Sequence, residues 1–249
     1  MSMPYPRKAS VIAISLLSML GTPLAIAHGD HAASDESVSD DHGHRHDHDH
    51  DHDHDHDHDH DHDHDHDHAH DDDIYAGYFD DDQVEDRSLS DWEGDWQSVY
   101  PYLQDGTLDE VFAHKAEEDD EKTAEEYQEY YETGYRTDVE RIVIEGSSVS
   151  FHADGDTRSG EYAYDGYEIL TYEAGNRGVR YIFALEEGGE DLPAFIQFSD
   201  HGIYPTDADH YHLYWGDDRD ALLEEVTNWP TYYPSSLDGQ AIVDEMLAH

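Results

Sequence analysis

The sequence predicts a mainly β protein built on an antiparallel β-barrel with a few flanking helices. Three observations predict this class. Short segments of alternating apolar and polar residues recur after Trp92, small loops rich in Gly, Asp and Asn separate them, and strands do not alternate regularly with helices. A period of two residues is typical of a strand with one buried face. Successive antiparallel strands favour an up-and-down barrel over a doubly wound sheet, which needs regular strand and helix alternation.

The first 27 residues are expected to be a cleaved signal peptide. Arg7 and Lys8 form a short basic region, residues 11–20 are apolar, and residues 25–27 (Ala-Ile-Ala) have the small side chains of a cleavage site. The apolar run is ~10 residues long, whereas a helix that spans a bilayer needs ~20. We therefore expect export of residues 28–249 without membrane insertion.

Residues 28–73 are predicted to form a disordered, metal-binding tail. With almost no apolar side chains, this segment cannot offset the ~1–2 kcal/mol per residue that ordering a backbone costs. Neutral imidazole is a ligand for zinc, copper and nickel, so we expect several weak accessory metal sites. A solvated linker or a purification tag is the alternative interpretation. The accessory ligands alternate mainly with Asp and are His42, His44, His46, His48, His50, His52, His54, His56, His58, His60, His62, His64, His66, His68 and His70.

Charge and cysteine content restrict the chemistry of the chain. It has 63 acidic and 12 basic residues, a net charge of −51, and no cysteine. Metal ligands must therefore come from His, Asp or Glu, and stability must come from a core rather than from disulfides. A surface this acidic repels nucleic acid and anionic lipid, so no nucleic-acid partner is expected. Residues 74–249 are long enough to form one domain with its own core.

Eight strands are predicted within this domain. Gly146, Asp165-Gly166 and Gly175-Asn176 stand where hairpin turns need a positive φ, so neighbouring strands should pair antiparallel. The predicted strands cover residues 95–103, 138–144, 148–152, 158–164, 168–173, 179–185, 195–199 and 211–215.

Three segments have helical periodicity: residues 108–134, 220–228 and 237–247. Ser236 is the expected N-cap of the last helix. The aromatic segment 228–234 contains two prolines, which stop a helix, and we expect it to cap one end of the barrel.

Three histidines form the candidate metal site. His210 and His212 are two residues apart on a predicted strand, so both imidazoles should lie on one face, ~7 Å apart. His201 follows the preceding strand, and Gly202 and Pro205 can turn the chain so that the three rings converge. Three imidazoles suit Zn²⁺ and leave a fourth position for water, a carboxylate or a tail histidine. The alternative interpretation is that His210 and His212 are simply two polar residues on a solvent-exposed strand face.

The remaining histidines of the domain carry less signal. His114 lies in a charged helix and His152 in a hairpin, and both are expected at the surface. The position of His249 at the chain end does not indicate whether this residue has a role in metal binding. Asp200 is not expected to orient His201, because adjacent residues of a strand point to opposite faces.

Several long strings of residues resemble the ZinT (YodA) family, periplasmic zinc- and cadmium-binding proteins with a lipocalin-like (calycin) barrel. The family's three histidine ligands fall on His201, His210 and His212. The N-terminal histidine segment of the family is usually short, whereas the one in this chain is long. The matching strings are residues 87–101, 164–172, 178–183, 195–201, 210–212 and 228–234.

This resemblance implies a periplasmic metallochaperone that acts in zinc homeostasis and the response to zinc shortage. It would capture scarce Zn²⁺, or Cd²⁺, and pass it to the binding protein of a zinc ABC importer. Cu²⁺ and Ni²⁺ are further metals that imidazole ligands accept.

Two other functions stay open at this point. A zinc-dependent hydrolase or hydratase could use the open fourth position, although no motif places a general base at a defined spacing, so we expect no enzyme. A lipocalin-type carrier of a small apolar molecule is compatible with a barrel.

Overall fold

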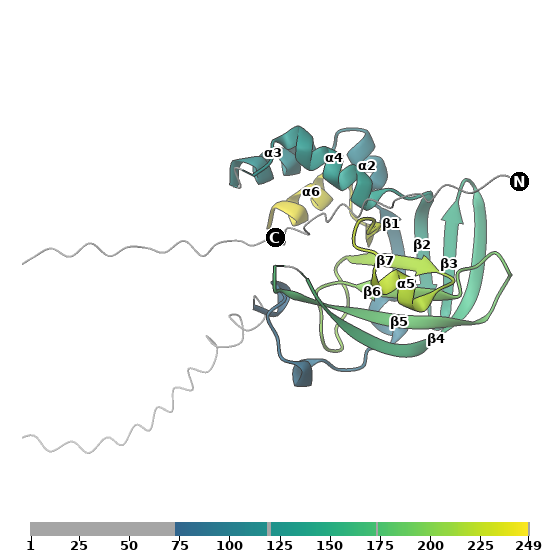
Figure 1. Cartoon of the computed structure of the whole chain (residues 1–249). Helices are drawn as coiled ribbons and strands as arrows, with labels where there is room; N and C mark the ends of the chain where they lie inside the picture. The colour runs from purple at the N-terminus through teal and green to yellow at the C-terminus, as the bar shows by residue number, and fades with distance from the viewer. Residues whose placement is uncertain (1–72, 119–120, 173, 249) are drawn as a thin grey trace, which may run out of the picture.

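The computed structural model describes residues 73–118, 121–172 and 174–248, and within them eight antiparallel strands close into a barrel (Figure 1). Each strand pairs with the next one in sequence, and β1 also pairs with β8. The predicted fold class is confirmed. The strands are β1 Gly94–Ser98, β2 Val139–Glu145, β3 Ser148–Ala153, β4 Asp156–Thr171, β5 Arg177–Glu187, β6 Phe195–Ser199, β7 Tyr211–Gly216 and β8 Thr231–Pro234.

Helices cover one side of this barrel. Figure 1 shows α2, α3, α4 and α6 gathered beside it, whereas α5 lies against the sheet near β7. Residues 73–75 form a helical turn where the described part of the chain begins. The helices are the short 3-10 helices η1 Asp81–Gln83 and η2 Leu89–Trp92, followed by α2 Tyr100–Gln104, α3 Asp109–Glu118, α4 Ala124–Tyr135, α5 Arg219–Leu223 and α6 Gly239–Ala248.

The fold has two hydrophobic cores that share the strands between them. The barrel core includes Tyr211 and Leu213 of β7, and a second core lies between the sheet and the helices and includes Tyr214. On β8, Tyr232 belongs to the barrel core and Tyr233 to the second core. Because side chains alternate along a strand, β7 and β8 form a wall with one face toward each core.

The predicted strand 95–103 is wrong in its second half. β1 ends at Ser98, and α2 begins at Tyr100. Pro101 lies in the first turn of α2, where its fixed φ suits the helix and its missing N–H group is not needed. The proline therefore starts a helix here instead of continuing the strand.

The two predicted strands 158–164 and 168–173 are one strand, β4, so the turn expected at Asp165-Gly166 is wrong. Gly166 does have a positive φ of 99°, as predicted. This conformation serves an irregularity in the ladder between Tyr164 and Tyr167, where β4 has one residue more than β5. Arg219 of α5 donates to Asp165 Oδ2 (3.1 Å) and Glu168 Oε1 (3.0 Å), on either side of this irregularity.

The segment 228–234 does not simply cap the barrel, because its second half is the closing strand β8. Tyr232 pairs with Tyr211 of β7 on one side and with Ser98 of β1 on the other. With only four residues and a proline at its end, this strand has too little alternation to be predicted from sequence.

The single helix predicted over 108–134 is also wrong, since α3 and α4 are separate. Thr123 caps α4: its Oγ1 accepts from the backbone N–H of Glu126 (3.2 Å), and the Glu126 carboxylate accepts from the Thr123 N–H (2.9 Å). This reciprocal capping box starts a new helix.

The other two helices differ from the prediction at their ends. α5 stops at Leu223 instead of Asn228, because the Glu225 carboxylate accepts from the backbone N–H groups of Thr227 (2.6 Å) and Asn228 (3.0 Å) and forms a turn. Ser236 does not cap α6. Asp238 Oδ1 accepts from the Ala241 N–H (2.9 Å) at its start instead.

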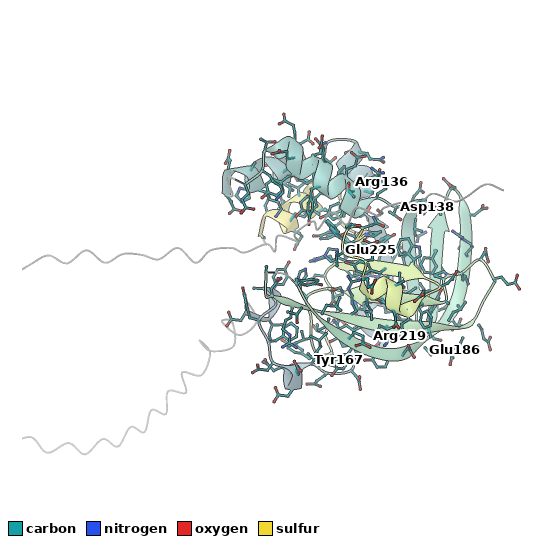
Figure 2. The ribbon with its side chains drawn as sticks, in the orientation of Figure 1. Arg136, Asp138, Tyr167, Glu186, Arg219 and Glu225 are labelled. Carbon is teal, nitrogen blue, oxygen red and sulfur yellow. The ribbon has the colours of Figure 1, made fainter. Side chains whose placement is uncertain are left out.

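Charged side chains line the outside of the molecule (Figure 2), including the exposed Arg136 and Glu186. None of the helices in the described ranges combines the length and the apolar character that crossing a bilayer requires.

Candidate metal centre

The fold brings the three predicted histidines together. His212 lies on β7, His210 immediately precedes that strand, and His201 lies in the loop between β6 and β7. Their ring centroids are 5.9 to 6.0 Å apart, and one ring nitrogen of each lies within 4.8 Å of the other two. Within the part of the chain that the structure describes, no other group of His, Asp or Glu residues has this geometry.

His210 and His212 face away from the barrel core. They alternate with Tyr211 and Leu213, which are fully buried inside the barrel. The ring of His210 is buried and stacks on Tyr233, with ring centroids 5.0 Å apart and an interplanar angle of 12°. The centre therefore lies on the outer wall of the barrel, next to the second core.

His212 is held in its neutral form. Its Nδ1 lies 2.8 Å from the hydroxyl of Thr231 on the neighbouring strand β8. Burial lowers the pKa of His212 well below its ordinary value of 6.5, and positive charge on His201 or His210 lowers it further. A smaller effect in the same direction comes from Arg180. A neutral ring has a free lone pair for a metal ion, so the site does not depend on metal to displace a proton from this residue.

His201 reaches the site from a loop, and its backbone has a positive φ of 66°. Its ring stacks on Tyr75 from the helical turn at residues 73–75, with centroids 4.4 Å apart. Burial raises the pKa of Tyr75 to about 12, so its hydroxyl stays protonated in the metal-free protein.

A buried ion cluster, which sequence reasoning missed, fixes the loop that carries His201. The side chain of Arg87 is fully buried and donates to Asp200 Oδ1 (2.7 Å), to Asp91 Oδ2 (2.8 Å) and to the carbonyl of Thr206 (2.7 Å). Asp200 also accepts from the N–H of Gly202 (3.2 Å). Asp200 thus sets the position of the loop through Arg87 and the Gly202 N–H. No sequence signal separates Arg87 from a surface arginine, except its place in the string that resembles the family.

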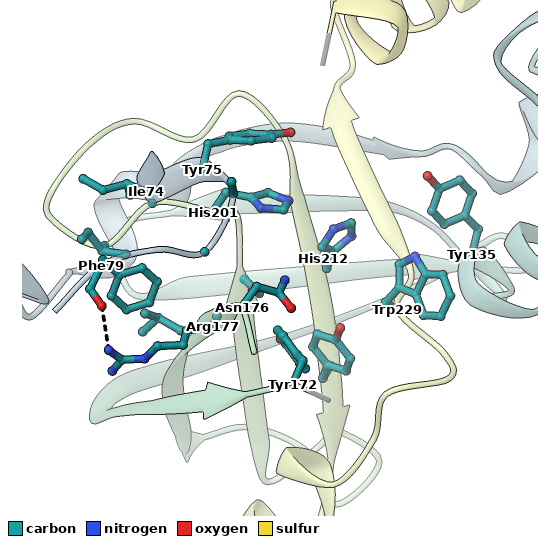
Figure 3. Close-up of a pocket in the computed structure, with 18 of the residues that line it drawn as sticks. Ile74, Tyr75, Phe79, Tyr135, Tyr172, Asn176, Arg177, His201, His212 and Trp229 are labelled. Atoms are coloured by element: carbon teal, nitrogen blue, oxygen red, sulfur yellow. Dashed lines mark hydrogen bonds between the residues drawn. The ribbon is translucent and has the colours of Figure 1, made fainter. Parts of the chain in front are cut away.

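A cavity of about 160 Å³ opens beside the histidines (Figure 3). His201 and His212 form part of its wall, and Figure 3 shows both rings pointing into the space between Tyr75 and Trp229. Further aromatic side chains of the wall are Tyr130, Tyr131, Tyr135, Tyr172 and Tyr214. The cavity lies where the barrel core and the second core meet, so residues of both line it.

His114 and His152, the two remaining histidines of the described residues, are not part of this group. His114 is exposed, and its Nε2 lies 3.6 Å from Glu118 Oε1. His152 is half-buried and its Nδ1 lies 2.9 Å from Thr157 Oγ1. The tail histidines from His42 to His70, and His249, lie outside the described residues.

A closed antiparallel barrel with three convergent imidazoles on its outer wall defines a lipocalin-like metal-binding protein. Residues 70–249 match the family model described as ZinT (YodA) periplasmic lipocalin-like zinc-recruitment. The chain belongs to this ZinT family, which confirms the resemblance seen in the sequence.

Known relatives share this region. The probable metal-binding protein YrpE of Bacillus subtilis is 70% identical over 176 residues, which are 71% of this chain and 70% of YrpE. The zinc-binding lipoprotein AdcA of Streptococcus pneumoniae is 48% identical over 177 residues, but the match spans only 35% of AdcA.

Solved structures agree with the fold. The crystal structure of Zn(II)-bound AdcA from Streptococcus pneumoniae has a TM-score of 0.69 at 47% identity, covering 71% of this chain and 38% of that one. The Zn(II)-bound ZinT-like domain of the same AdcA has a TM-score of 0.68 at 47% identity, covering 70% of this chain and 97% of that domain.

Proposed function

We propose that the protein captures zinc through His201, His210 and His212 and hands it on to a zinc importer. The observation that carries this proposal is the convergence within 4.8 Å of three imidazoles from the strand β7 and the loop that precedes it. Nitrogen ligands ~2.0–2.1 Å from a tetrahedral Zn²⁺ ion lie ~3.4 Å apart, so small side-chain rotations would complete the site. Cd²⁺, Cu²⁺ and Ni²⁺ are the competing ions that the same ligands would accept.

Preorganisation supports tight binding at this centre. The pKa of His212 is depressed, His210 is stacked on Tyr233, and the loop of His201 is fixed by Arg87. Each ligand is therefore held before metal arrives, which lowers the entropy cost of binding. Zinc is also the metal in both AdcA structures that resemble this chain.

Export and transfer are the finer parts of the proposal. Residues 1–27 have the pattern of a cleaved leader, the family description places ZinT proteins in the periplasm, and AdcA is a lipoprotein. Zinc recruitment outside the cytoplasmic membrane needs a recipient, and the binding protein of a zinc ABC importer is the recipient that we propose. The tail, residues 28–73, would hold further ions weakly because each must order a loop of chain around itself.

Binding is favoured over catalysis. The relatives carry names that describe metal binding, and no carboxylate of the described residues joins the three histidines in one group. The aromatic cavity is the observation that favours the second candidate, a carrier of a small apolar molecule.

Calorimetric titration with Zn²⁺ of the chain from His28 tests the proposal. We expect one tight equivalent and several weaker ones. His210→Ala with His212→Ala should remove the tight class, deletion of residues 28–70 should remove only the weak class, and the control variants His114→Ala and His152→Ala should keep both. A tight class that survives the double substitution refutes the site, and ester hydrolysis by the zinc form that disappears in the double variant would favour an enzyme.

A further inference from the structure

The side chain of Thr231 connects His212 to the backbone of the neighbouring strand. His212 and Thr231 are direct partners in the ladder between β7 and β8. Thr231 is 1% exposed, its Oγ1 lies 2.8 Å from His212 Nδ1, and the same oxygen donates to the carbonyl of Trp229 at 2.9 Å. One hydroxyl therefore contacts a ring nitrogen and a carbonyl at the same time.

Counting protons assigns the direction of both hydrogen bonds. A hydroxyl group has one proton, and a backbone carbonyl can only accept. Because the proton of Thr231 goes to Trp229, its oxygen must accept from His212, so Nδ1 of His212 has to carry a hydrogen. In a neutral imidazole the lone pair then lies on Nε2.

The Trp229 carbonyl, which accepts the hydroxyl proton of Thr231, is itself held in place. The N–H of Trp229 donates to the carbonyl of Gly134 at the end of α4 (2.6 Å). The side chain of Asn228 donates to the same carbonyl (3.0 Å) and to that of Arg136 (3.0 Å). The Trp229 carbonyl is thereby fixed against the helical layer, and it keeps the hydroxyl proton of Thr231 pointed away from His212.

We propose that Thr231 is a positioning residue that locks His212 in the Nδ1–H tautomer and aims Nε2 at the metal ion. This inference rests on the proposed function of His212 as a ligand. With the other tautomer, Nε2 would carry a hydrogen that points into the site and must be lost before zinc binds, and the Trp229 carbonyl would lose its hydroxyl donor.

The test compares the full chain with Thr231→Val, which removes the hydroxyl at similar volume, and Thr231→Ser, which restores it. Zinc affinity is measured by competition with a chelator. We expect Thr231→Val to bind about 10–100-fold more weakly, the range for lost outer partners of metal ligands, and Thr231→Ser to bind like the wild type. Equal affinity in all three proteins, or equal loss in both variants, would overturn the proposal.

A second measurement is made on the wild type, and a variant serves only to assign its signals. The ring ¹⁵N signals of His212 in the metal-free wild type at pH 8, assigned by their loss in His212→Asn, report which nitrogen is protonated. We expect a protonated Nδ1 and an unprotonated Nε2. The reverse assignment would refute the proposed role of Thr231. If this tautomer is found but the wild type binds no zinc tightly, the proposed function fails and the tautomer assignment stands.

Discussion

Two regions of different kind hold the three imidazoles. The wall formed by β7 and β8 places His210 and His212 through a backbone ladder, ring stacking and the Thr231 hydroxyl. The loop between β6 and β7 places His201 through side-chain charges, since Arg87 binds Asp200 and the carbonyl of Thr206. The wall is stabilised by many distributed contacts, whereas in the loop one buried cation, Arg87, joins Asp200 to the Thr206 carbonyl and adds to the stacking of His201 on Tyr75. The two regions should therefore respond differently to single substitutions.

The largest effect on the unfolding free energy is expected from Arg87→Met, which removes the buried cation beside the loop of His201. The side chains of Arg87 and Asp200 are 0% and 2% exposed, so the substitution leaves a buried carboxylate without its cation. Such a loss costs about 3–5 kcal/mol of unfolding free energy, measurable by urea denaturation. Zinc affinity should fall as well, because Asp200 no longer fixes the loop of His201.

The matched control is Arg136→Gln, which removes an exposed arginine paired with Glu132 at 3.1 Å. Its unfolding midpoint should equal that of the wild type. If Arg87→Met is as stable as this control, the loop does not depend on the buried cluster, and the contrast with the wall is lost.

A smaller effect on the unfolding free energy is expected from Gly134→Ala, which changes the packing of α4 against Trp229, the residue that precedes β8 by two positions. A Cβ at Gly134 would lie 2.3 Å from Cζ2 of Trp229. Relieving this overlap by shifting Trp229 should cost about 1–3 kcal/mol of unfolding free energy. Thr133→Ala, an exposed change on the same helix, is the control and should unfold like the wild type. Equal stability of the two variants would show that this packing is loose.

The smallest effect is a pH dependence that belongs to the wall alone. Because the pKa of His212 is depressed, the folded metal-free protein binds fewer protons than the unfolded chain below pH ~6.5. Its unfolding free energy should be at its full value above that pH and fall toward the depressed pKa as the pH drops, by at most about 1.4 kcal/mol per pH unit.

Comparing the wild type with His212→Gln and His114→Gln in urea at pH 7.5 and 5.5 isolates this contribution. His114 is exposed, so its variant should keep the wild-type pH dependence, whereas His212→Gln should weaken it. An unchanged slope in His212→Gln would show that this ring does not resist protonation in the folded protein.

The sequence predicted the barrel because alternation and glycine turns are local signals. It failed where one local signal serves two structures: the positive φ of Gly166 fits a hairpin turn and also the ladder irregularity in β4. The strand β8 was missed because its pairing with β1 joins residues more than 130 positions apart and its own pattern is too short. The predicted number of strands agrees with the structure only because these two errors cancel.

For the site, the spacing of His210 and His212 predicted two rings on one face, and the structure brings His201 to them. Arg87 could not be predicted, because an arginine is buried only when a fold supplies its carboxylate partners. Asp91 is close to it in sequence, but Asp200 is 113 residues away. The three convergent histidines were therefore visible in the sequence, whereas the groups that position them became visible only in three dimensions.

Because His210 and His212 point outward, the residues that fill the barrel core and these two residues of the candidate metal site lie on opposite faces of the same strand. Tyr211 and Leu213, the residues that alternate with them, fill the barrel, while the imidazoles belong to the opposite surface of the same strand. Substitutions of Tyr211 or Leu213 repack the barrel core on the face of β7 that points away from His210 and His212. The strand β7 can thus accumulate mutations for stability on one face and mutations of the proposed metal site on the other, which makes the outer wall a suitable place to redesign that site for another ion.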